Sequence, residues 1–164
     1  MKAIVNVDKN WGIGHDGDLL QFIPGDMKFF KENTIGNVVV MGRTTFDSLP
    51  GKQPLKDRTN IVLTKNKSFK SDGVIVLNSV EEVLEEIKKY SEDEVYIIGG
   101  EMIYKQLLPY CKEAYITKNS SVNDADKFFP RLDQDSNWEM IYESEKQQYK
   151  DIEYVFTTYK NNNL

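Results

Sequence analysis

The sequence is poor in the two residue types that most often build disulfides, metal sites and nucleophilic triads. Its 164 residues include one cysteine, Cys111, and one histidine, His15. A single cysteine excludes an internal disulfide framework and suits a reducing compartment, so we expect a cytoplasmic protein in which Cys111 is a small, semi-buried apolar residue. His15 has no cysteine at metal-ligand spacing, so we expect no metal site and no histidine-based triad.

Long apolar segments and basic runs are also missing. The first ten residues, MKAIVNVDKN, lack the apolar centre of a signal peptide, and no later segment approaches the length of a membrane span. The chain has 21 Lys and Arg against 26 Asp and Glu, a net charge of −5, and no basic stripe offsets this balance. Nucleic acids and anionic membranes are therefore poor candidate partners, and a bound anion would need a local pocket of donors.

What the sequence does contain is an alternation of short β-rich runs and helical segments. The apolar runs in NVVVMG, TNIVLT and EVYIIGG suit strands buried on both faces of a parallel sheet. The last two runs, WEMIYESEKQQY and IEYVFTTYK, have no helix between them, and the KD at Lys150 and Asp151 suggests a hairpin turn. We predict an α/β fold in one domain, residues 1–164, with a single central, mostly parallel, twisted sheet, an antiparallel C-terminal edge strand and helices on both faces.

Four helices are expected from capping and periodicity. One runs from about Pro24 to Asn33, a second covers RTTFDSL, and a third opens with a capping box formed by Ser79 and Glu82. The fourth, EMIYKQLLPYC, is expected to end at Pro109. The segment from Asp8 to Asp18, rich in glycine and aspartate, is expected to be a loop.

Two of the predicted strands end in glycine and lead directly into a helix, in VVVMGRTTF and YIIGGEMIY. Ligands bind beyond the carboxyl ends of parallel strands, glycine allows close approach of the backbone, and helix N-termini favour phosphate. Such turns often contain glycine for structural reasons alone, but two together indicate a site for the pyrophosphate of a dinucleotide. The Rossmann pattern GxGxxG is absent, so this cradle is of another kind.

The cations near these junctions favour a phosphorylated cofactor. Arg43, one of only three arginines, follows the first glycine junction and precedes Thr44 and Thr45. The next strand ends in Thr64 and Lys65. The fixed fork of arginine suits phosphate, and cations in place of the acid that usually binds the ribose of NAD favour the extra phosphate of NADP.

Two further charged residues each admit two interpretations. Asp26 follows Pro24 in the first turn of a helix, where free amides stabilise a carboxylate. It also shares a helix face with Phe30, where a carboxylate needs a partner or a shifted pKa, and a ligand with a cationic or amide-like donor face would supply that partner. Arg58 could clamp the carboxylate of a ligand, or it could form a surface ion pair with Asp57.

These motifs occur together in the order and spacing of a known enzyme family. GIGHDGDLLQFIPGDMKFFKENT, VVVMGRTTFDSLP, IVLT, VYIIGGEMIYKQLLP and ADKFFP resemble the corresponding segments of bacterial-type dihydrofolate reductases, and the resemblance extends from Ala3 to about Tyr159. It implies reduction of 7,8-dihydrofolate to 5,6,7,8-tetrahydrofolate by hydride from NADPH, in the service of one-carbon metabolism. It also implies an oxidoreductase that binds antifolate inhibitors, and we expect a monomer.

The resemblance assigns roles to residues at matching positions. Asp26 matches the acid that holds the pterin through its amino and ring-nitrogen hydrogens and promotes protonation of the ring nitrogen beside the carbon that accepts hydride. Thr117 falls where the family supports this acid through a water, Leu19 and Gln21 complete the implied catalytic set, and Arg58 matches the arginine that pairs with the glutamate tail of folate. The remaining implied substrate-binding positions are Ile4, Val5, Asn6, Met27, Phe30, Leu49, Leu55 and Ile98, together with Thr117 itself.

The implied cofactor-binding positions lie on the loop before the first helix and on the two glycine junctions. The loop from Asn10 to Leu20 matches the mobile flap that closes over the nicotinamide, and its glycines give the backbone the necessary freedom. The positions are Asn6, Ile13, Gly14, Gly17, Asp18, Leu19, Gly42, Arg43, Thr44, Thr45, Leu63, Thr64, Lys65, Ile98, Gly99, Gly100, Glu101, Met102, Ile103 and Tyr104.

Two positions depart from the family pattern. After the leucine of the flap the family usually has Pro-Trp, and this chain has Leu20 and Gln21. The tryptophan helps to hold an ordered water near the pterin, so Gln21 must replace that role by hydrogen bonding or leave it empty. Asn6 stands where a small residue, often alanine, usually lines the pterin end.

Two other functions remain open from the sequence. A related NADPH-dependent reductase of a riboflavin-pathway pyrimidine shares the fold, but it does not predict Asp26 together with Arg58. A non-catalytic nucleotide-binding module that has lost turnover is the second alternative, and Gln21 and Asn6 keep it open.

Overall fold

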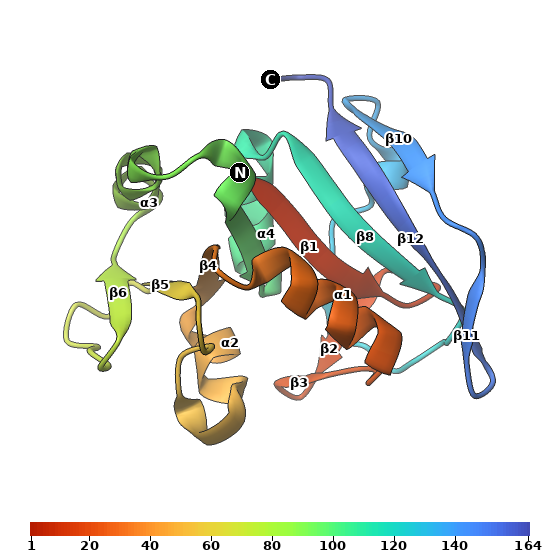
Figure 1. Cartoon of the computed structure of the whole chain (residues 1–164), viewed down its shortest axis with the longest axis horizontal. Coiled ribbons are helices and arrows are strands. Elements are labelled where there is room, and N and C mark those ends of the chain that lie inside the picture. The colour runs from red at the N-terminus through yellow and green to blue at the C-terminus, as the bar shows by residue number, and fades with distance from the viewer.

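A nine-stranded sheet forms the centre of the computed structural model, which describes residues 1–164 (Figure 1). Its strand order is β10-β12-β8-β1-β7-β4-β5-β6, with β11 paired to β12. The strands β1, β4, β5, β6, β7 and β8 are parallel, and β10, β11 and β12 add antiparallel pairs at one end. The bounds are β1 Lys2–Val7, β4 Val38–Gly42, β5 Thr59–Leu63, β6 Val74–Leu77, β7 Val95–Gly99, β8 Glu113–Asn119, β10 Trp138–Glu143, β11 Gln147–Tyr149 and β12 Ile152–Asn161.

The predicted mostly parallel sheet is therefore confirmed, with one refinement at its antiparallel end. The C-terminal strand β12 lies between β8 and β10, so β10 is the edge strand. The run WEMIYESEKQQY was expected to form one strand, but it is divided into β10 and β11. Ser144 interrupts it because its hydroxyl accepts a hydrogen bond from the backbone N–H of Phe156 at 2.9 Å and so replaces a backbone acceptor of the ladder. The predicted hairpin turn at Lys150 and Asp151 joins β11 to β12.

The four predicted helices are present as α1 Pro24–Thr34, α2 Arg43–Ser48, α3 Val80–Glu86 and α4 Glu101–Leu107. The cap of α3 is as predicted, because the Ser79 hydroxyl accepts from the Glu82 backbone N–H at 3.1 Å. The fourth helix ends earlier than expected, and a 3-10 turn from Leu108 to Tyr110 follows it. Pro109 has no N–H to donate to the carbonyl four residues before it, so regular helix stops ahead of the proline. None of the helices has the length and apolar character needed to cross a bilayer.

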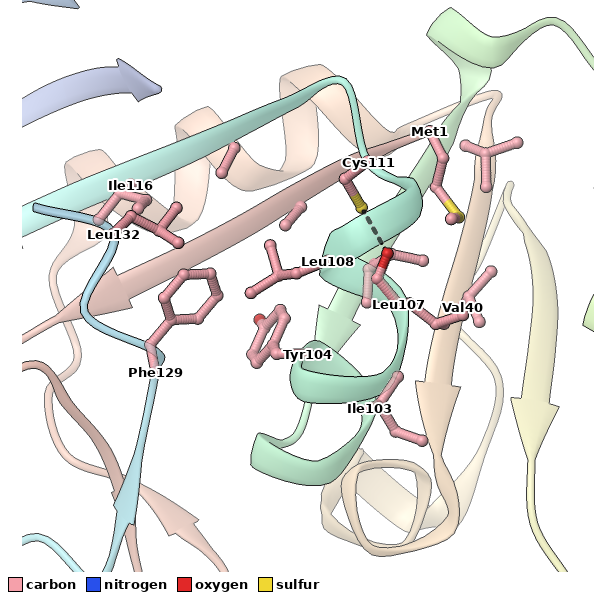
Figure 2. Packing of buried hydrophobic residues seen from close by; sticks show 14 of the residues in the cluster. Met1, Val40, Ile103, Tyr104, Leu107, Leu108, Cys111, Ile116, Phe129 and Leu132 are labelled. Atoms are coloured by element: carbon pink, nitrogen blue, oxygen red, sulfur yellow. Dashed lines mark hydrogen bonds between the residues drawn. The ribbon is translucent and has the colours of Figure 1, made fainter. Parts of the chain in front are cut away.

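Alternation along the strands divides the core between the two faces of the sheet. In β4, Val38 and Val40 belong to the larger buried cluster, whereas Val39 and Met41 belong to a smaller one with Phe46 of α2. Helix α4 contributes side chains to the larger cluster, and these side chains point toward the strands (Figure 2). Helices α1 and α2 cover the opposite face, and the continuous apolar runs of the central strands follow from burial on both sides.

The segment from Asp8 to Asp18 is more ordered than the loop expected from its composition. Strands β2 Gly12–His15 and β3 Asp18–Leu19 form a hairpin, and β9 Lys127–Phe128 joins β2 in a second, three-stranded sheet. Asp16 and Gly17 occupy the turn with φ of 53° and 85°, the left-handed pair that an Asp-Gly dipeptide favours. The Asp-Gly signal was present in the sequence, but the strands beside it are too short to stand out.

Candidate active site

The side chain of Asp26 is held by two neutral donors from neighbouring strands. Asn6 in β1 lies opposite Thr117 in β8. From these positions the Thr117 hydroxyl donates to Oδ1 of Asp26 at 2.6 Å, and the Asn6 amide donates to Oδ2 at 3.0 Å. The resemblance implied that Thr117 acts through a water; the structure shows a direct contact instead, because the strand pairing places the hydroxyl against the start of α1.

Burial dominates the electrostatics of this carboxylate. Removal from water raises the pKa of Asp26 above its usual range, and the hydrogen bonds from Thr117 and Asn6 offset only part of that rise. No charged side chain contributes to the shift. Asp26 is therefore more than the helix-end acid of the simpler interpretation: it is a carboxylate with spare acceptor capacity and no counter-ion in the protein.

The other residues expected around a substrate come from several elements and differ in exposure. Ile4 is buried, Phe30 is half-buried, and Met27, the fourth residue of α1, is 40% exposed. Three more, Leu49, Leu55 and Ile98, pack against the small cluster on the same face of the sheet. Val5 is the exception, because its side chain packs with the cluster on the α4 face.

The two glycine junctions lie side by side. They follow the neighbouring strands β4 and β7, and Met41 pairs with Gly99. A Cβ on Gly42 would lie 2.9 Å from Cγ1 of Ile103, and Gly99 has φ of 124°, so neither position accepts a side chain without strain. No side chain caps the first amides of α2 or α4. The junctions thus present free backbone donors without side chains in front of them, which fits the phosphates of a dinucleotide.

Arg43 is held in place by two neighbours that sequence reasoning did not identify. Its Nε donates to both carboxylate oxygens of Asp47, at 3.2 and 3.1 Å, and its guanidinium carbon lies 4.0 Å from the centre of the Phe69 ring. The side chain is 41% exposed, so the other guanidinium nitrogens remain available to an anion. Of the other polar positions at this edge, Thr44 and Lys65 are exposed, and Thr64 accepts a bond from the Asn66 N–H.

Of the remaining residues that are expected to bind the cofactor, some are buried or bonded within the protein and others are exposed. Tyr104 is buried and its hydroxyl donates to the Ile4 carbonyl at 2.8 Å, which joins α4 to β1. The carboxylate of Glu101 accepts a hydrogen bond from the backbone N–H of Phe128 at 2.6 Å, so it already has a partner in the protein. The other buried residues of this set are Ile13, Gly14, Leu63 and Ile103, and the exposed ones are Gly17, Asp18, Leu19 and Met102. Thr45 and Gly100 lie close together at the two junctions, because Oγ1 of Thr45 is 3.5 Å from a Cβ built on Gly100.

Arg58 does not form the surface ion pair with Asp57. Its Nη1 donates to the Thr34 hydroxyl at 3.1 Å, and its Nε donates to the Lys56 carbonyl at 2.9 Å. Burial lowers the pKa of Arg58, and Asp57 opposes that change only as a nearby charge. The guanidinium is thus fixed against the end of α1 while Nη2 forms no hydrogen bond within the protein.

Gln21 does not contact Asp26. Its side-chain amide donates to Oδ1 of Asn123 at 2.9 Å, in the segment between β8 and β9. Asn119 is a second polar residue that sequence reasoning missed: it is 5% exposed and donates to Asn6 at 2.7 Å. The signal was the alternation of Thr117 and Asn119 in a strand, which places both on one face.

Comparison with known proteins agrees with this geometry. The family model for dihydrofolate reductase matches residues 1–161. The chain is 34% identical to the dihydrofolate reductase of Bacillus subtilis (strain 168) over 162 residues, 98% of this chain and 94% of that protein. It is 39% identical to the dihydrofolate reductase of Haemophilus influenzae over 136 residues, 83% and 79% of the two chains. A dihydrofolate reductase from Enterococcus faecalis, complexed with NADP(H) and RAB-propyl, superimposes with a TM-score of 0.88 at 38% identity, covering 98% of this chain and 95% of that one.

The raised pKa of Asp26 makes its ionisation destabilising. Below the ordinary value of 3.8 the group is protonated in both the folded and unfolded states. As pH rises above 3.8, the unfolded chain releases its proton first, so the free energy of unfolding falls until the folded group is ionised as well. We expect Asp26→Asn to abolish this fall and to raise the free energy of unfolding at pH 7 by about 1 kcal/mol, measured by urea denaturation.

The matched control is Asp72→Asn, which removes a negative charge from an exposed side chain. It should leave the free energy of unfolding unchanged at both pH 4 and pH 7. If Asp26→Asn lowers the free energy of unfolding at pH 7, the ionised carboxylate stabilises the fold and burial does not dominate its pKa.

Proposed function

The chain belongs to the dihydrofolate reductase family, and on that premise we propose how its residues reduce 7,8-dihydrofolate to 5,6,7,8-tetrahydrofolate with NADPH. The observation that carries the proposal is the carboxylate of Asp26, surrounded by two neutral donors and no cation. Its free lone pairs accept the amino and ring-nitrogen hydrogens of the pterin. Because the carboxylate is negative and partly desolvated, it favours protonation of the ring nitrogen beside the carbon that accepts hydride.

When NADPH is bound, it supplies the hydride, and the protein positions it and stabilises the charge of its phosphates. Gly42, Gly99 and Gly100 let the backbone approach its phosphates, and the open amides at the starts of α2 and α4 donate to them. Arg43 binds the extra phosphate with the guanidinium nitrogens that Asp47 leaves free. The buried hydroxyl of Tyr104 ties this half of the site to the substrate half through the Ile4 carbonyl.

Two further elements complete the proposed site. Arg58 is anchored by Thr34 and keeps Nη2 free, which suits a carboxylate in the glutamate tail of the substrate. The hairpin of β2 and β3 closes over the reacting rings, and Leu19, which is 76% exposed, is the apolar side chain at its end. Both halves of the proposed site lie on the one nine-stranded sheet, so we propose a single domain over residues 1–164 that acts as a monomer. The single buried cysteine supports a cytoplasmic location.

Turnover of dihydrofolate tests the function, and Asp26→Asn tests the role of the acid. The wild-type protein should consume NADPH only when dihydrofolate is present, followed as loss of the near-ultraviolet absorbance of the reduced cofactor. Asp26→Asn should still bind NADPH but slow hydride transfer at neutral pH by about 10²–10⁴-fold. The rate should recover in part at lower pH, where the substrate acquires its proton from solvent.

Each alternative gives a different result in the same assay. Turnover of an aminopyrimidine intermediate alone would identify the riboflavin-pathway reductase. Binding of NADPH without turnover of either substrate would identify a non-catalytic module. If Asp26→Asn turns over dihydrofolate normally near neutrality, the proposed role of the acid is wrong while the function stands.

Arg43→Ala tests the binding of the extra phosphate. A charge-assisted hydrogen bond contributes about 1.5–3 kcal/mol, so the Kd of NADPH should rise at least about tenfold while that of NADH changes little, measured by fluorescence titration. Lys146→Ala is the control, because it removes an exposed cation paired with Glu153 near β11. Equal weakening of both cofactors by Arg43→Ala would place the extra phosphate elsewhere.

A further inference from the structure

The two positions that depart from the family pattern lie on one continuous path of hydrogen bonds. The path runs through six side chains: Gln21, Asn123, Ser121, Asn119, Asn6 and Asp26. It connects the segment that follows β3 to the carboxylate at the start of α1, by way of the segment after β8. Neither Gln21 nor Asn6 is therefore an isolated substitution, because each occupies one end of the neutral part of this path.

Every donor on the path points toward Asp26. Asn6 donates to Oδ2 of Asp26 at 3.0 Å, and Asn119 donates to Oδ1 of Asn6 at 2.7 Å. The Ser121 hydroxyl donates to Oδ1 of Asn119. Asn123 donates to the Ser121 hydroxyl oxygen at 2.9 Å, and Gln21 donates to Oδ1 of Asn123, also at 2.9 Å. Aligned bonds polarise one another, so each link strengthens the donor at the carboxylate.

Fixed groups at both ends set this direction. An ionised carboxylate only accepts, so Asn6 must turn its amide nitrogen toward Asp26. The backbone N–H of Ser121 also donates to Oδ1 of Asn119, at 3.0 Å, which leaves the nitrogen of Asn119 to face Asn6. At the far end the second amide hydrogen of Asn123 goes to the carboxylate of Asp8, at 3.3 Å. None of these amides can reverse without placing two donors or two acceptors against each other.

Thr117 differs from Asn6 in this respect. Its hydroxyl donates to Oδ1 of Asp26, but a hydroxyl rotates and can accept instead. The Asn6 amide is locked as a donor by Asn119. When Asp26 is protonated, the proton therefore resides on Oδ1, where Thr117 can turn to accept it, and Oδ2 continues to accept from Asn6.

We propose that Asn6 is a positioning residue for Asp26, locked as a donor by a one-way chain of hydrogen bonds that reaches Gln21. The chain keeps the carboxylate oriented, favours its ionised form and reports its protonation to the segment beside the flap. This inference rests on the proposed role of Asp26 in the reaction. The measurements that test it use the ligand-free protein and do not depend on turnover.

Few other titratable groups face this carboxylate. Tyr104 of α4 is the one whose charge would interact with that of Asp26, and burial raises its pKa far above the working range, so it stays neutral. Tyr154 of β12 places its hydroxyl against Gly25 in α1. Asp8 touches the chain at Asn123, so a variant without the Asp26 carboxylate is needed to separate the effects of the two acids.

The first test is the titration of the Asp26 carboxyl carbon by NMR. A hydrogen bond to a charged group contributes about 1.5–3 kcal/mol, so Asn6→Ala should raise the pKa of Asp26 and lower its acid dissociation constant about tenfold. A small residue at this position is compatible with the fold of the family. An unchanged dissociation constant in folded Asn6→Ala would overturn the proposal.

The second test follows the side-chain amide signals of the chain across the same pH range. In the wild-type protein, Asn6, Asn119 and Gln21 should share the inflection of Asp26, with an amplitude that decreases along the chain. Asp26→Asn should remove that inflection from all three, and any change left at Gln21 belongs to Asp8. The exposed Gln106, which lies between Lys105 and Leu107, should not share the inflection of Asp26.

Ser121→Ala separates the chain from a simple effect of distance. It removes the hydroxyl between Asn119 and Asn123 but keeps the backbone N–H that orients Asn119. Gln21 should then lose the Asp26 inflection while Asn6 retains it. If Gln21 retains the inflection in Ser121→Ala, or if the wild-type Gln21 signal never shows it, the chain does not connect the two sites and the proposal fails.

Discussion

A buried carboxylate loses its hydrogen bonds to water and needs other donors in their place. In this protein the donors to Asp26 are all neutral. Thr117 and Asn6 hold its two oxygens at hydrogen-bonding distance, and no cation neutralises it. An internal lysine or arginine would have satisfied the charge and closed the site to a ligand. Neutral donors favour the ionised form of this poorly solvated group and leave it able to accept further hydrogen bonds, which is the condition that the proposed binding and protonation of the pterin require.

The fold supplies this arrangement through strand register and helix placement. The parallel pairing of β1 with β8 puts Asn6 and Thr117 on one face of the sheet, and α1 lays Asp26 across them. The neighbouring pair β4 and β7 puts both glycine junctions at the same edge. On the opposite face, Tyr104 and Leu107 of α4 pack with the buried side chains of the strands (Figure 2). The segments proposed to bind substrate and cofactor thus belong to one sheet, and the hydrogen bond from Tyr104 to the Ile4 carbonyl joins them directly.

Much of this could be predicted from the sequence, and the failures have physical reasons. Continuous apolar runs indicate buried parallel strands, and capping residues such as Ser79 indicate where helices begin, so the architecture was predictable. The division of WEMIYESEKQQY depended on a single hydroxyl, that of Ser144, bonding across the ladder. The partners of Arg43 and Gln21 were not predictable, because Phe69 and Asn123 are distant in sequence and only the folded chain brings them near. Local patterns specify elements, whereas side-chain partners are set by tertiary contacts.

The path from Gln21 to Asp26 also constrains how this sequence can change with time. Replacing Asn6 alone by a smaller residue leaves the buried amide of Asn119 without its acceptor, and replacing Asn119 alone frees Asn6 to turn. Each single step passes through an intermediate with an unsatisfied polar group, while a paired exchange avoids it. The polar residues around Asp26 therefore form an energetically coupled unit. A single replacement at Asn6 or Asn119 is therefore expected to lower stability more than the paired exchange does.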